Sequence, residues 1–330
     1  MVEELYPNIY VNRIPLPNFP VKATNSYIIK SGQRNLIIDT GIGTEIGREA
    51  MMQGIRELKV DLSKTDLILT HLHPDHTGIA SFLQDQGAAI YIGKTDGQLI
   101  KQMYSKTSKT ALEQLYEVLL DEIDVMPIRK NEFGYDLTET VQFDFLTEKD
   151  SISIGDYTFE VVDIPGHTPG HIGLLERKHR LFFGGDHILN KITPSVMFWG
   201  FEQDILGLYI SSLRKVYDYN LDYLFPAHDT LIRDYKTRID ELISHVEERL
   251  DEVKKIISQK KKAPLEITSQ VQWNVPCRWE DFPRTLKLLA LGETVSHLEH
   301  LVYRGVAERH YDQGIVYYQL SGFGNENKEE

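Results

Sequence analysis

Residues 70–78 read THLHPDHTG and directly follow the apolar run DLIL at residues 66–69. The run predicts a buried strand, so the histidines stand where that strand ends. His71 and His73 are two residues apart in an extended segment, and their side chains therefore leave the same face. Both can reach one metal ion.

Pro74 ends this extension, and Asp75 and His76 stand where a helix is expected to begin. Their side chains can turn toward a second point nearby. Any one of these residues alone would be read as a polar loop residue or a helix cap. Together they indicate metal, because neutral imidazole and carboxylate suit Zn²⁺ and a hydrolytic zinc site keeps an open position for water.

Three more side chains of the ligand type each follow a predicted strand. His167 comes after FEVVDIPG, Asp186 after RLFFGG and His228 after YLFPA. The four segments THLHPDHTG, GHTPGH, GGD and PAH, in this order, resemble the motif set of metallo-β-lactamase-fold hydrolases over about residues 5–235. The resemblance implies an α/β fold, an αββα sandwich in which two β-sheets pack between outer helices and the ligands lie on loops at one edge.

The resemblance also assigns roles by position. It gives a first metal to His71, His73 and His167 and a second to Asp75, His76 and His228, with Asp186 bridging the two. It implies two Zn²⁺ ions per chain, with iron or manganese also compatible. Two such ions lower the pKa of a shared water and polarise the bond under attack. Asp75 is expected to be the catalytic proton shuttle if one ion is bound, and a ligand if both are.

Other polar residues have expected supporting or packing roles. Asp39, in IIDTG, matches a position that supports the site from outside and is expected to orient a histidine. His171 is expected to support the site or to pack, and His187 at best to face substrate or support the site. The other histidines are expected to be surface or partly packed residues: His179, His245, His297, His300 and His310.

Composition limits the class of protein. The 330 residues fit one large domain and a small one, and 41% hydrophobic with 26% charged residues is ordinary for a globular protein. No apolar stretch approaches the roughly 20 residues that cross a bilayer. The acidic first residues do not resemble a secretory signal, so a cytoplasmic location is expected. Cys277 is the single cysteine, which excludes an internal disulfide and a cysteine-rich zinc site.

The domain organisation follows from the order of the predicted elements. A catalytic domain is expected over residues 1–232, with a helical cap inserted at about 96–130. A linker helix over 233–262 leads to a winged-helix-like domain over 263–330. In that domain two short helices, at 281–292 and 293–306, precede a hairpin that turns at Asp312-Gln313-Gly314.

A metallo-β-lactamase domain followed by a small winged helix resembles a branch that includes bacterial proteins of loosely assigned hydrolase activity and an animal endoribonuclease. The predicted function is a hydrolase that uses a metal-bound hydroxide to cleave an ester, thioester or lactone of a small metabolite. A single-strand endoribonuclease with the same dinuclear site is the alternative. A non-hydrolytic diiron protein is a minor alternative.

The expected partners depend on charge and on one aromatic loop. Met197, Phe198 and Trp199 could either wall the substrate site or pack as a small core under the cap. The net charge of -13 opposes non-specific capture of nucleic acid, although the run Lys260–Lys262 could contact phosphates or simply be a solvated linker end. Residues 293–300 hold no Lys or Arg, so sequence-specific DNA binding is not expected. The tail could instead wall the cleft or form a homodimer contact.

Overall fold

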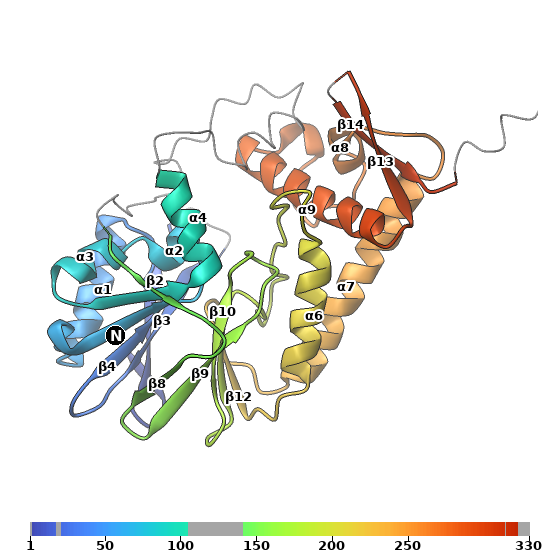
Figure 1. Ribbon diagram of the computed structural model, residues 1–330. Coiled ribbons are helices and arrows are strands. Elements are labelled where there is room, and N and C mark those ends of the chain that lie inside the picture. Colours follow the sequence, from blue (N-terminus) through green and yellow to red (C-terminus); the bar gives the residue numbers. More distant parts are fainter. Residues whose placement is uncertain (1, 18–20, 105–140, 314, 323–330) are drawn as a thin grey trace, which may run out of the picture. The chain divides into compact units, whose positions relative to one another are not determined.

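The computed structural model describes residues 2–17, 21–104, 141–313 and 315–322 (Figure 1). The chain divides into two compact units. The sandwich unit comprises residues 1–106, 129–194 and 212–239, and the helical unit comprises residues 107–128, 195–211 and 240–330. The helices α6 (Ile205–Tyr217) and α7 (Tyr235–Ile256) each have residues in both units.

Two β-sheets build the sandwich unit. In the larger sheet the strands lie side by side in chain order: β1 (Glu3–Tyr6), β2 (Ile9–Pro15), β3 (Ala23–Ile29), β4 (Asn35–Ile38), β5 (Thr65–Leu69), β6 (Ala89–Gly93) and β7 (Asp144–Leu146). The smaller sheet has the order β12 (Tyr223–Pro226), β11 (Leu181–Gly185), β10 (Ile172–Glu176), β9 (Tyr157–Asp163) and β8 (Ser151–Ile154). The strands from β4 to β7 are parallel, as are β11 and β12.

The two sheets share one apolar core. Alternate residues of the facing strands point inward, as the strand period of two requires. Tyr27 from β3 meets Phe183 from β11 edge to face at 5.1 Å, and Phe183 stacks on Phe225 from β12 at 4.4 Å. Each of these three rings is at most 3% exposed. A side chain buried to this extent contributes about 1.5–3 kcal/mol, and the predicted sandwich is confirmed.

Helices of the sandwich unit pack on its larger sheet. The first, α1 (Glu45–Glu57), contacts β2, and its N-cap Thr44 accepts a hydrogen bond from the Gly47 N–H at 3.1 Å. The short helices α2 (Pro74–Thr77) and α3 (Ala80–Asp85) follow β5, and α4 (Lys94–Tyr104) follows β6. The predicted cap begins on α4. Residues 105–130 of that cap lie outside the described residues.

The helical unit differs from the expected order of elements. It contains α8 (Pro264–Thr268), α9 (Arg284–Tyr303) and the hairpin of β13 (Ala307–Asp312) and β14 (Ile315–Leu320). The hairpin is confirmed, but the two helices predicted at 281–292 and 293–306 are one continuous helix. The first of them was expected to end at Gly292. The Gly292 carbonyl accepts the Phe198 N–H at 3.1 Å, so a loop backbone packs against the middle of α9.

The predicted linker helix at 233–262 is present as α7, which ends at Ile256. The domain limits at 232 and 262, and the winged-helix assignment of residues 263–330, stay predictions. Among the described residues, no helix combines the length and apolar composition that crossing a membrane would need.

The aromatic loop packs inside the helical unit. Phe198 is 1% exposed and its ring lies 4.8 Å from that of Phe201. Ser296 of α9 donates its hydroxyl to the Val196 carbonyl at 2.7 Å, next to the bond from the Phe198 N–H to Gly292. Of the two interpretations left open by the sequence, packing therefore holds for Phe198, and α9 is the element against which it packs.

Two histidines of α9 are buried, against expectation. His297 is 3% and His300 7% exposed. The Nδ1 of His297 donates to the Glu293 carbonyl at 2.8 Å, and the Nδ1 of His300 lies 2.9 Å from Oδ2 of Asp204. The prediction of surface or partly packed positions was wrong for both, because their polar atoms find partners inside the unit. His179 is 24% exposed at its side chain and partly packed, as expected.

Candidate metal centre

Four segments at one edge of the sandwich unit carry all seven predicted ligands. The first follows β5, with His71 and His73 before α2 and Asp75 and His76 on it; His167 lies between β9 and β10, Asp186 follows β11, and His228 follows β12. Because β11 and β12 run parallel, their carboxyl ends meet at the same edge. The topology therefore brings residues that are far apart in sequence to one place.

Three imidazole nitrogens converge in a first cluster. Nδ1 of His73 lies 3.1 Å from Nε2 of His71 and 2.9 Å from Nε2 of His167. A single N–H proton cannot form good hydrogen bonds among all three nitrogens at these separations. Nitrogens bound tetrahedrally to zinc at 2.0–2.1 Å stand about 3.4 Å apart. The spacing of the first cluster therefore fits a single metal ion.

A second cluster lies beside the first. Oδ2 of Asp75 is 3.3 Å from Nε2 of His228 and 3.5 Å from Nε2 of His76. These distances exceed those of good charge-assisted hydrogen bonds, for which about 2.7–2.9 Å is usual. The three atoms surround a common point, as ligands of a second ion would.

Asp186 lies between the two clusters. Its Oδ2 is 3.6 Å from Nε2 of His76 and 3.6 Å from Nε2 of His167, and its Oδ1 is 3.4 Å from Nε2 of His228. Nε2 of His76 and Oδ1 of Asp186 are buried and make no hydrogen bond within the described part of the chain. Such orphaned atoms fit coordination to a cation. The structure brings all seven residues together, while their role as ligands stays a prediction.

Asp39 fixes the orientation of two histidines. Its Oδ2 accepts the Nδ1–H of His76 at 2.9 Å and the Thr70 hydroxyl at 2.8 Å. Because the Thr70 hydroxyl donates to Asp39, it accepts from Nδ1 of His71, at 3.0 Å. Both imidazoles then carry their proton on Nδ1 and turn the lone pair of Nε2 toward the cluster. The expectation that Asp39 orients a histidine is confirmed.

His228 is fixed in the same way from β3. Its Nδ1 donates to the Ala23 carbonyl at 2.8 Å, which leaves Nε2 for the cluster. The preceding Pro226 carbonyl accepts from the Tyr27 hydroxyl at 2.6 Å and from the Asn25 amide at 3.0 Å. The last loop of the smaller sheet is therefore held by a strand of the larger one.

The two clusters differ in charge. Burial, together with the neighbouring His167, lowers the pKa of His73 to about 3, and burial also lowers the pKa of His71, so both of these imidazoles are neutral at pH 7. Burial also opposes protonation of His228, but the carboxylates of Asp186 and Asp75 outweigh it and raise the pKa of His228 to about 10. The second cluster thus attracts positive charge, which a divalent cation can supply in place of protons.

Residues 20–228, a span that includes all seven residues, match the model of the metallo-beta-lactamase superfamily. The chain belongs to this superfamily. Its members are generally hydrolases with a metal site, and the superfamily fold implies divalent metal binding.

Known proteins of similar sequence or fold align with most of this chain. A "Beta-lactamase-like protein 2 homolog" of Caenorhabditis elegans is 25% identical over 319 residues, covering 94% of this chain and 90% of the relative. The atrochrysone carboxyl ACP thioesterase of Aspergillus fumigatus is 24% identical over 245 residues, covering 74% of this chain and 47% of the relative. A metallo-beta-lactamase family protein from Thermus thermophilus is similar in fold, with a TM-score of 0.81 at 23% identity and coverage of 96% of this chain and 100% of that chain.

Two further histidines of this metallo-beta-lactamase fold support the cluster or pack beside it. His171 accepts the Asp186 N–H on Nε2 at 3.1 Å, and its ring stacks on that of His71 at 4.7 Å. A supporting role for His171 is confirmed. Gly185 has φ +53°, and a Cβ there would lie 2.6 Å from the His171 ring, so only glycine fits. His187 is fully buried, and burial lowers its pKa to about 3.

Asp96 on α4 is a buried residue of the same fold that the sequence did not single out. It is 0% exposed and bonds to the loops of His71, His73 and His167. An acidic residue in the first turn of a helix is common, because it complements the helix dipole. That signal alone could not distinguish Asp96 from any other such residue.

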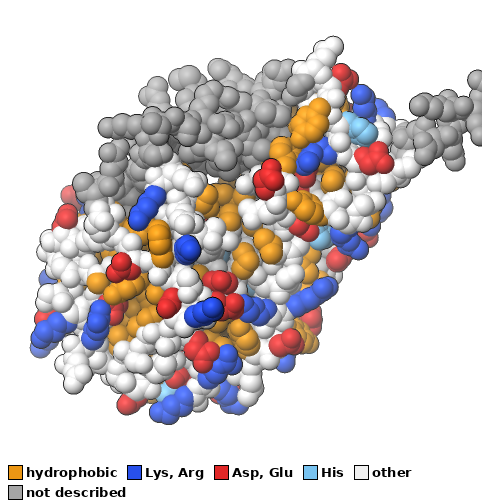
Figure 2. Space-filling model, viewed as in Figure 1, with side chains coloured by type: hydrophobic (Ala, Val, Ile, Leu, Met, Phe, Trp, Pro, Cys, Tyr) orange, Lys and Arg blue, Asp and Glu red, His pale blue; other side chains and the backbone are white. Residues whose placement is uncertain are grey.

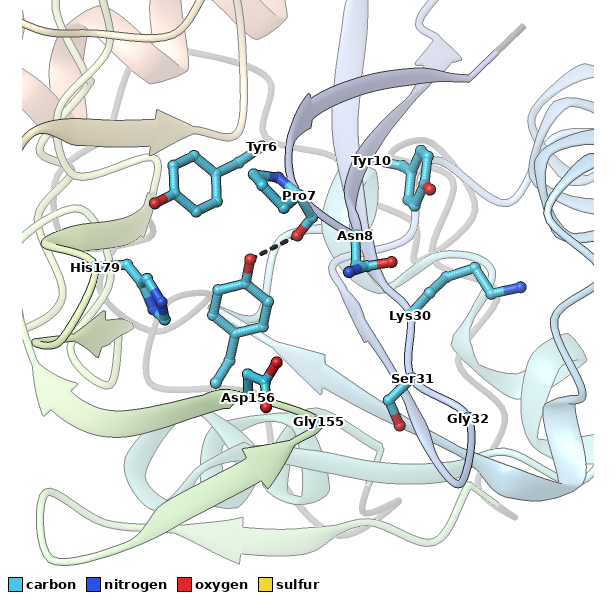
Figure 3. A pocket seen from close by; sticks show the side chains of 11 residues that line it. Tyr6, Pro7, Asn8, Tyr10, Lys30, Ser31, Gly32, Gly155, Asp156 and His179 are labelled. Carbon is cyan, nitrogen blue, oxygen red and sulfur yellow. Dashed lines mark hydrogen bonds between the residues drawn. The ribbon is translucent and has the colours of Figure 1, made fainter.

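A separate cavity of about 630 Å³ lies among turns of the two sheets (Figure 3). Tyr6, Asn8, Lys30 and Tyr157 line it, and the Tyr157 hydroxyl donates to the Pro7 carbonyl at 2.5 Å. None of the seven clustered residues belongs to its lining.

Proposed function

We propose that this protein is a two-metal hydrolase that cleaves an ester, thioester or lactone of a small metabolite. The observation that carries the proposal is the position of Asp186, whose Oδ2 lies 3.6 Å from a histidine of each cluster. One carboxylate shared by two ligand sets is the arrangement that two neighbouring ions require.

Zinc is the proposed metal. The donors are imidazole nitrogens and carboxylate oxygens, which zinc accepts readily, although iron and manganese accept them too. When bound, the ions would lower the pKa of a water and polarise the carbonyl under attack. Cys277 is exposed and is not among the clustered residues, so no thiolate takes part.

The chain's own residues hold protons at defined atoms. The Nδ1–H of His71 donates to the Thr70 hydroxyl and the Nδ1–H of His76 donates to the Asp39 carboxylate, which leaves each Nε2 free to bind. Asp75 has 19% of its side chain exposed, more than the 10% of Asp186. We assign to it the role of taking a proton from the attacking water and returning it to the leaving group if one ion is bound. With both ions bound it is a ligand.

The substrate class rests on the carbonyl chemistry of the site and on one relative. The Aspergillus fumigatus relative is named a thioesterase, and a thioester is an activated carbonyl. We place a thioester first among the three candidate bonds for this reason. Esters and lactones present the same carbonyl and a leaving oxygen to the same groups.

Cleavage of single-stranded RNA at the same site is the alternative. The basic run that could contact phosphates is already engaged: Lys260 pairs with Glu266 at 3.3 Å, and Lys261 with Asp312 at 3.3 Å. Lys262 is 8% exposed and donates to the Ile256 carbonyl at 2.6 Å. On the face shown in Figure 2, acidic and basic side chains are interspersed. These features favour the small-molecule substrate.

A panel of substrates tests the proposal. Protein loaded with zinc should hydrolyse at least one ester, thioester or lactone. Asp186→Asn should bind less zinc and hydrolyse that substrate about 10–100-fold more slowly, or slower still, because changes to residues that only support metal ligands already have effects of this size. The exposed Asp85→Asn, the same chemical change on α3, is the matched control and should behave as wild type.

Other outcomes would redirect the assignment. Full activity in Asp186→Asn would contradict the two-metal mechanism. Metal-dependent, salt-sensitive cutting of unstructured RNA, without any carbonyl substrate, would favour the endoribonuclease. Iron rather than zinc in protein purified without added metal would favour the diiron alternative.

A further inference from the structure

Asp96 joins two loops of the candidate metal centre. It is the third residue of α4 and is 0% exposed. Its Oδ2 accepts the Leu72 N–H at 2.9 Å and the Thr168 hydroxyl at 2.6 Å, and its Oδ1 accepts the Gly170 N–H at 2.6 Å. Both carboxylate oxygens are thus used, and every bond goes to a loop that carries histidines of the first cluster.

The bonded residues are close neighbours of those histidines in the chain. Leu72 stands between His71 and His73, and Thr168 follows His167. One buried carboxylate therefore joins the two loops whose imidazole nitrogens converge, in addition to the backbone bond from the Ile172 N–H to the Thr70 carbonyl at 2.9 Å. The loops are otherwise separated by more than ninety residues of chain, so no local geometry fixes the distance between them.

The close packing around Asp96 shows that its position is specified. A Cβ on Gly170 would lie 2.2 Å from the Asp96 backbone nitrogen and 2.6 Å from its Oδ1. A Cβ on Gly93, at the end of β6, would lie 2.5 Å from the Gly170 carbonyl oxygen. Glycine at both places lets the His167 loop rest directly on the junction of β6 and α4. Burial raises the pKa of Asp96 to about 6, so at neutral pH the carboxylate is ionised and accepts at both oxygens.

We propose that Asp96 is a positioning residue that holds His71, His73 and His167 at the spacing one divalent cation needs. The inference rests on the proposed metal site and deepens it. The second cluster has different anchors, since Asp39 holds His76 and the Ala23 carbonyl holds His228. Asp96 therefore acts most directly on the first of the two metal positions.

Zinc titration of the full chain tests this, with nitrogen NMR of the imidazole rings assigning each binding step to a cluster. Asp96→Asn keeps the side-chain volume but replaces one oxygen by an N–H₂ donor. Either the Leu72 or the Gly170 N–H then loses its acceptor. The step that shifts the rings of His73 and His167 should weaken about 10–100-fold, while the step that shifts His76 and His228 should keep the wild-type affinity.

A matched control and two milder variants keep the test decisive. Asp61→Asn alters another aspartate that accepts a backbone N–H, from Ser63 at 3.1 Å, outside these loops, and should bind zinc as wild type. Thr168→Val removes one of the three hydrogen bonds to Asp96 and should weaken zinc binding at the step of His73 and His167, but by less than Asp96→Asn does. Thr168→Ser retains the hydroxyl and should bind zinc at that step with the wild-type affinity. These two variants decide the question if Asp96→Asn does not fold.

The outcomes separate this inference from the proposed function. Wild-type affinity at both steps in Asp96→Asn and Thr168→Val, or equal weakening of both steps, would overturn the positioning role alone. Failure of the wild-type protein to bind zinc at all would overturn the proposed function instead.

Discussion

At the scale of single residues, Asp39 is the side chain on which most of the site's orientation depends. It has φ +58°, a left-handed conformation that costs a residue other than glycine about 1 kcal/mol. In return its carboxylate accepts from the Thr70 N–H and hydroxyl, both at 2.8 Å, and from Nδ1 of His76. Three donors on one buried carboxylate fix the start of the β5 loop.

Replacing Asp39 by Asn should weaken the second metal position. The amide would present a donor where Nδ1–H of His76 or the Thr70 hydroxyl needs an acceptor, so the tautomer of His76 is no longer fixed. Zinc affinity at the cluster of Asp75, His76 and His228 should fall about 10–100-fold. Competition with a chelator of known affinity measures it. The prediction fails if Asp39→Asn binds as tightly as the exposed Asp85→Asn.

Most residues of the candidate site could be predicted from the sequence, but Asp96 could not. His71 and His73 were found because their spacing, two residues apart on a strand end, has few other uses. His167, Asp186 and His228 were found by motif order as well as by position. Asp96 was missed because two of its three partners are backbone N–H groups, and no sequence pattern records which carboxylate will meet a distant backbone.

At the scale of elements, β3 connects the two sheets near the site. The Asn25 N–H donates to the Ala227 carbonyl at 2.7 Å, and the Tyr27 hydroxyl donates to the Pro226 carbonyl at 2.6 Å. These bonds stabilise the end of β12, directly before His228. A strand of the larger sheet thereby positions a residue that the smaller sheet supplies.

Tyr27→Phe tests this connection between sheets. The variant loses one buried hydrogen bond, worth about 1 kcal/mol of unfolding free energy, because the Asn25 amide still satisfies the Pro226 carbonyl. Zinc binding at the cluster of His228 should weaken, and binding at the cluster of His73 should not change. Urea unfolding and zinc titration measure the two effects. Tyr311→Phe, on a ring that is 60% exposed, should change neither; equal effects of both variants would refute the role of β3.

Elements were predictable where periodicity is clear. The strand expected from the apolar run at residues 66–69 is present as β5, Thr65–Leu69, because that run is uninterrupted. In α9 the pattern misled. Its second half is buried on nearly every side, so it shows no apolar stripe, and Gly292 looked like a stop. Buried polar groups such as Ser296 are satisfied by a loop that the sequence could not place there.

At the scale of the whole molecule, stability should depend on pH through His297. Burial lowers the pKa of His297 to about 3. The folded chain therefore keeps this ring neutral while the unfolded chain protonates it below its ordinary pKa of 6.5. The stability that the folded chain has with a neutral His297 is fully present above pH 6.5 and is lost as the pH falls toward 3. Between pH 6.5 and 5 the loss amounts to about 2 kcal/mol.

His297→Asn measures that contribution. Asparagine keeps an N–H near the position of Nδ1 for the Glu293 carbonyl and cannot take up a proton. In urea unfolding of the metal-free chain, the variant should lose less stability than wild type between pH 6.5 and 5. An identical loss in both proteins would show that His297 does not carry the pH dependence.

The central claim is that the seven clustered residues hold two ions, and anomalous X-ray scattering from crystals grown with zinc tests it most directly. Two peaks per chain are expected. The first should lie about 2.1 Å from Nε2 of His71, Nδ1 of His73 and Nε2 of His167, the second about 2.1 Å from Nε2 of His76 and of His228, and both should contact Asp186. A single peak, or zinc bound elsewhere while these residues remain free of metal, would contradict it.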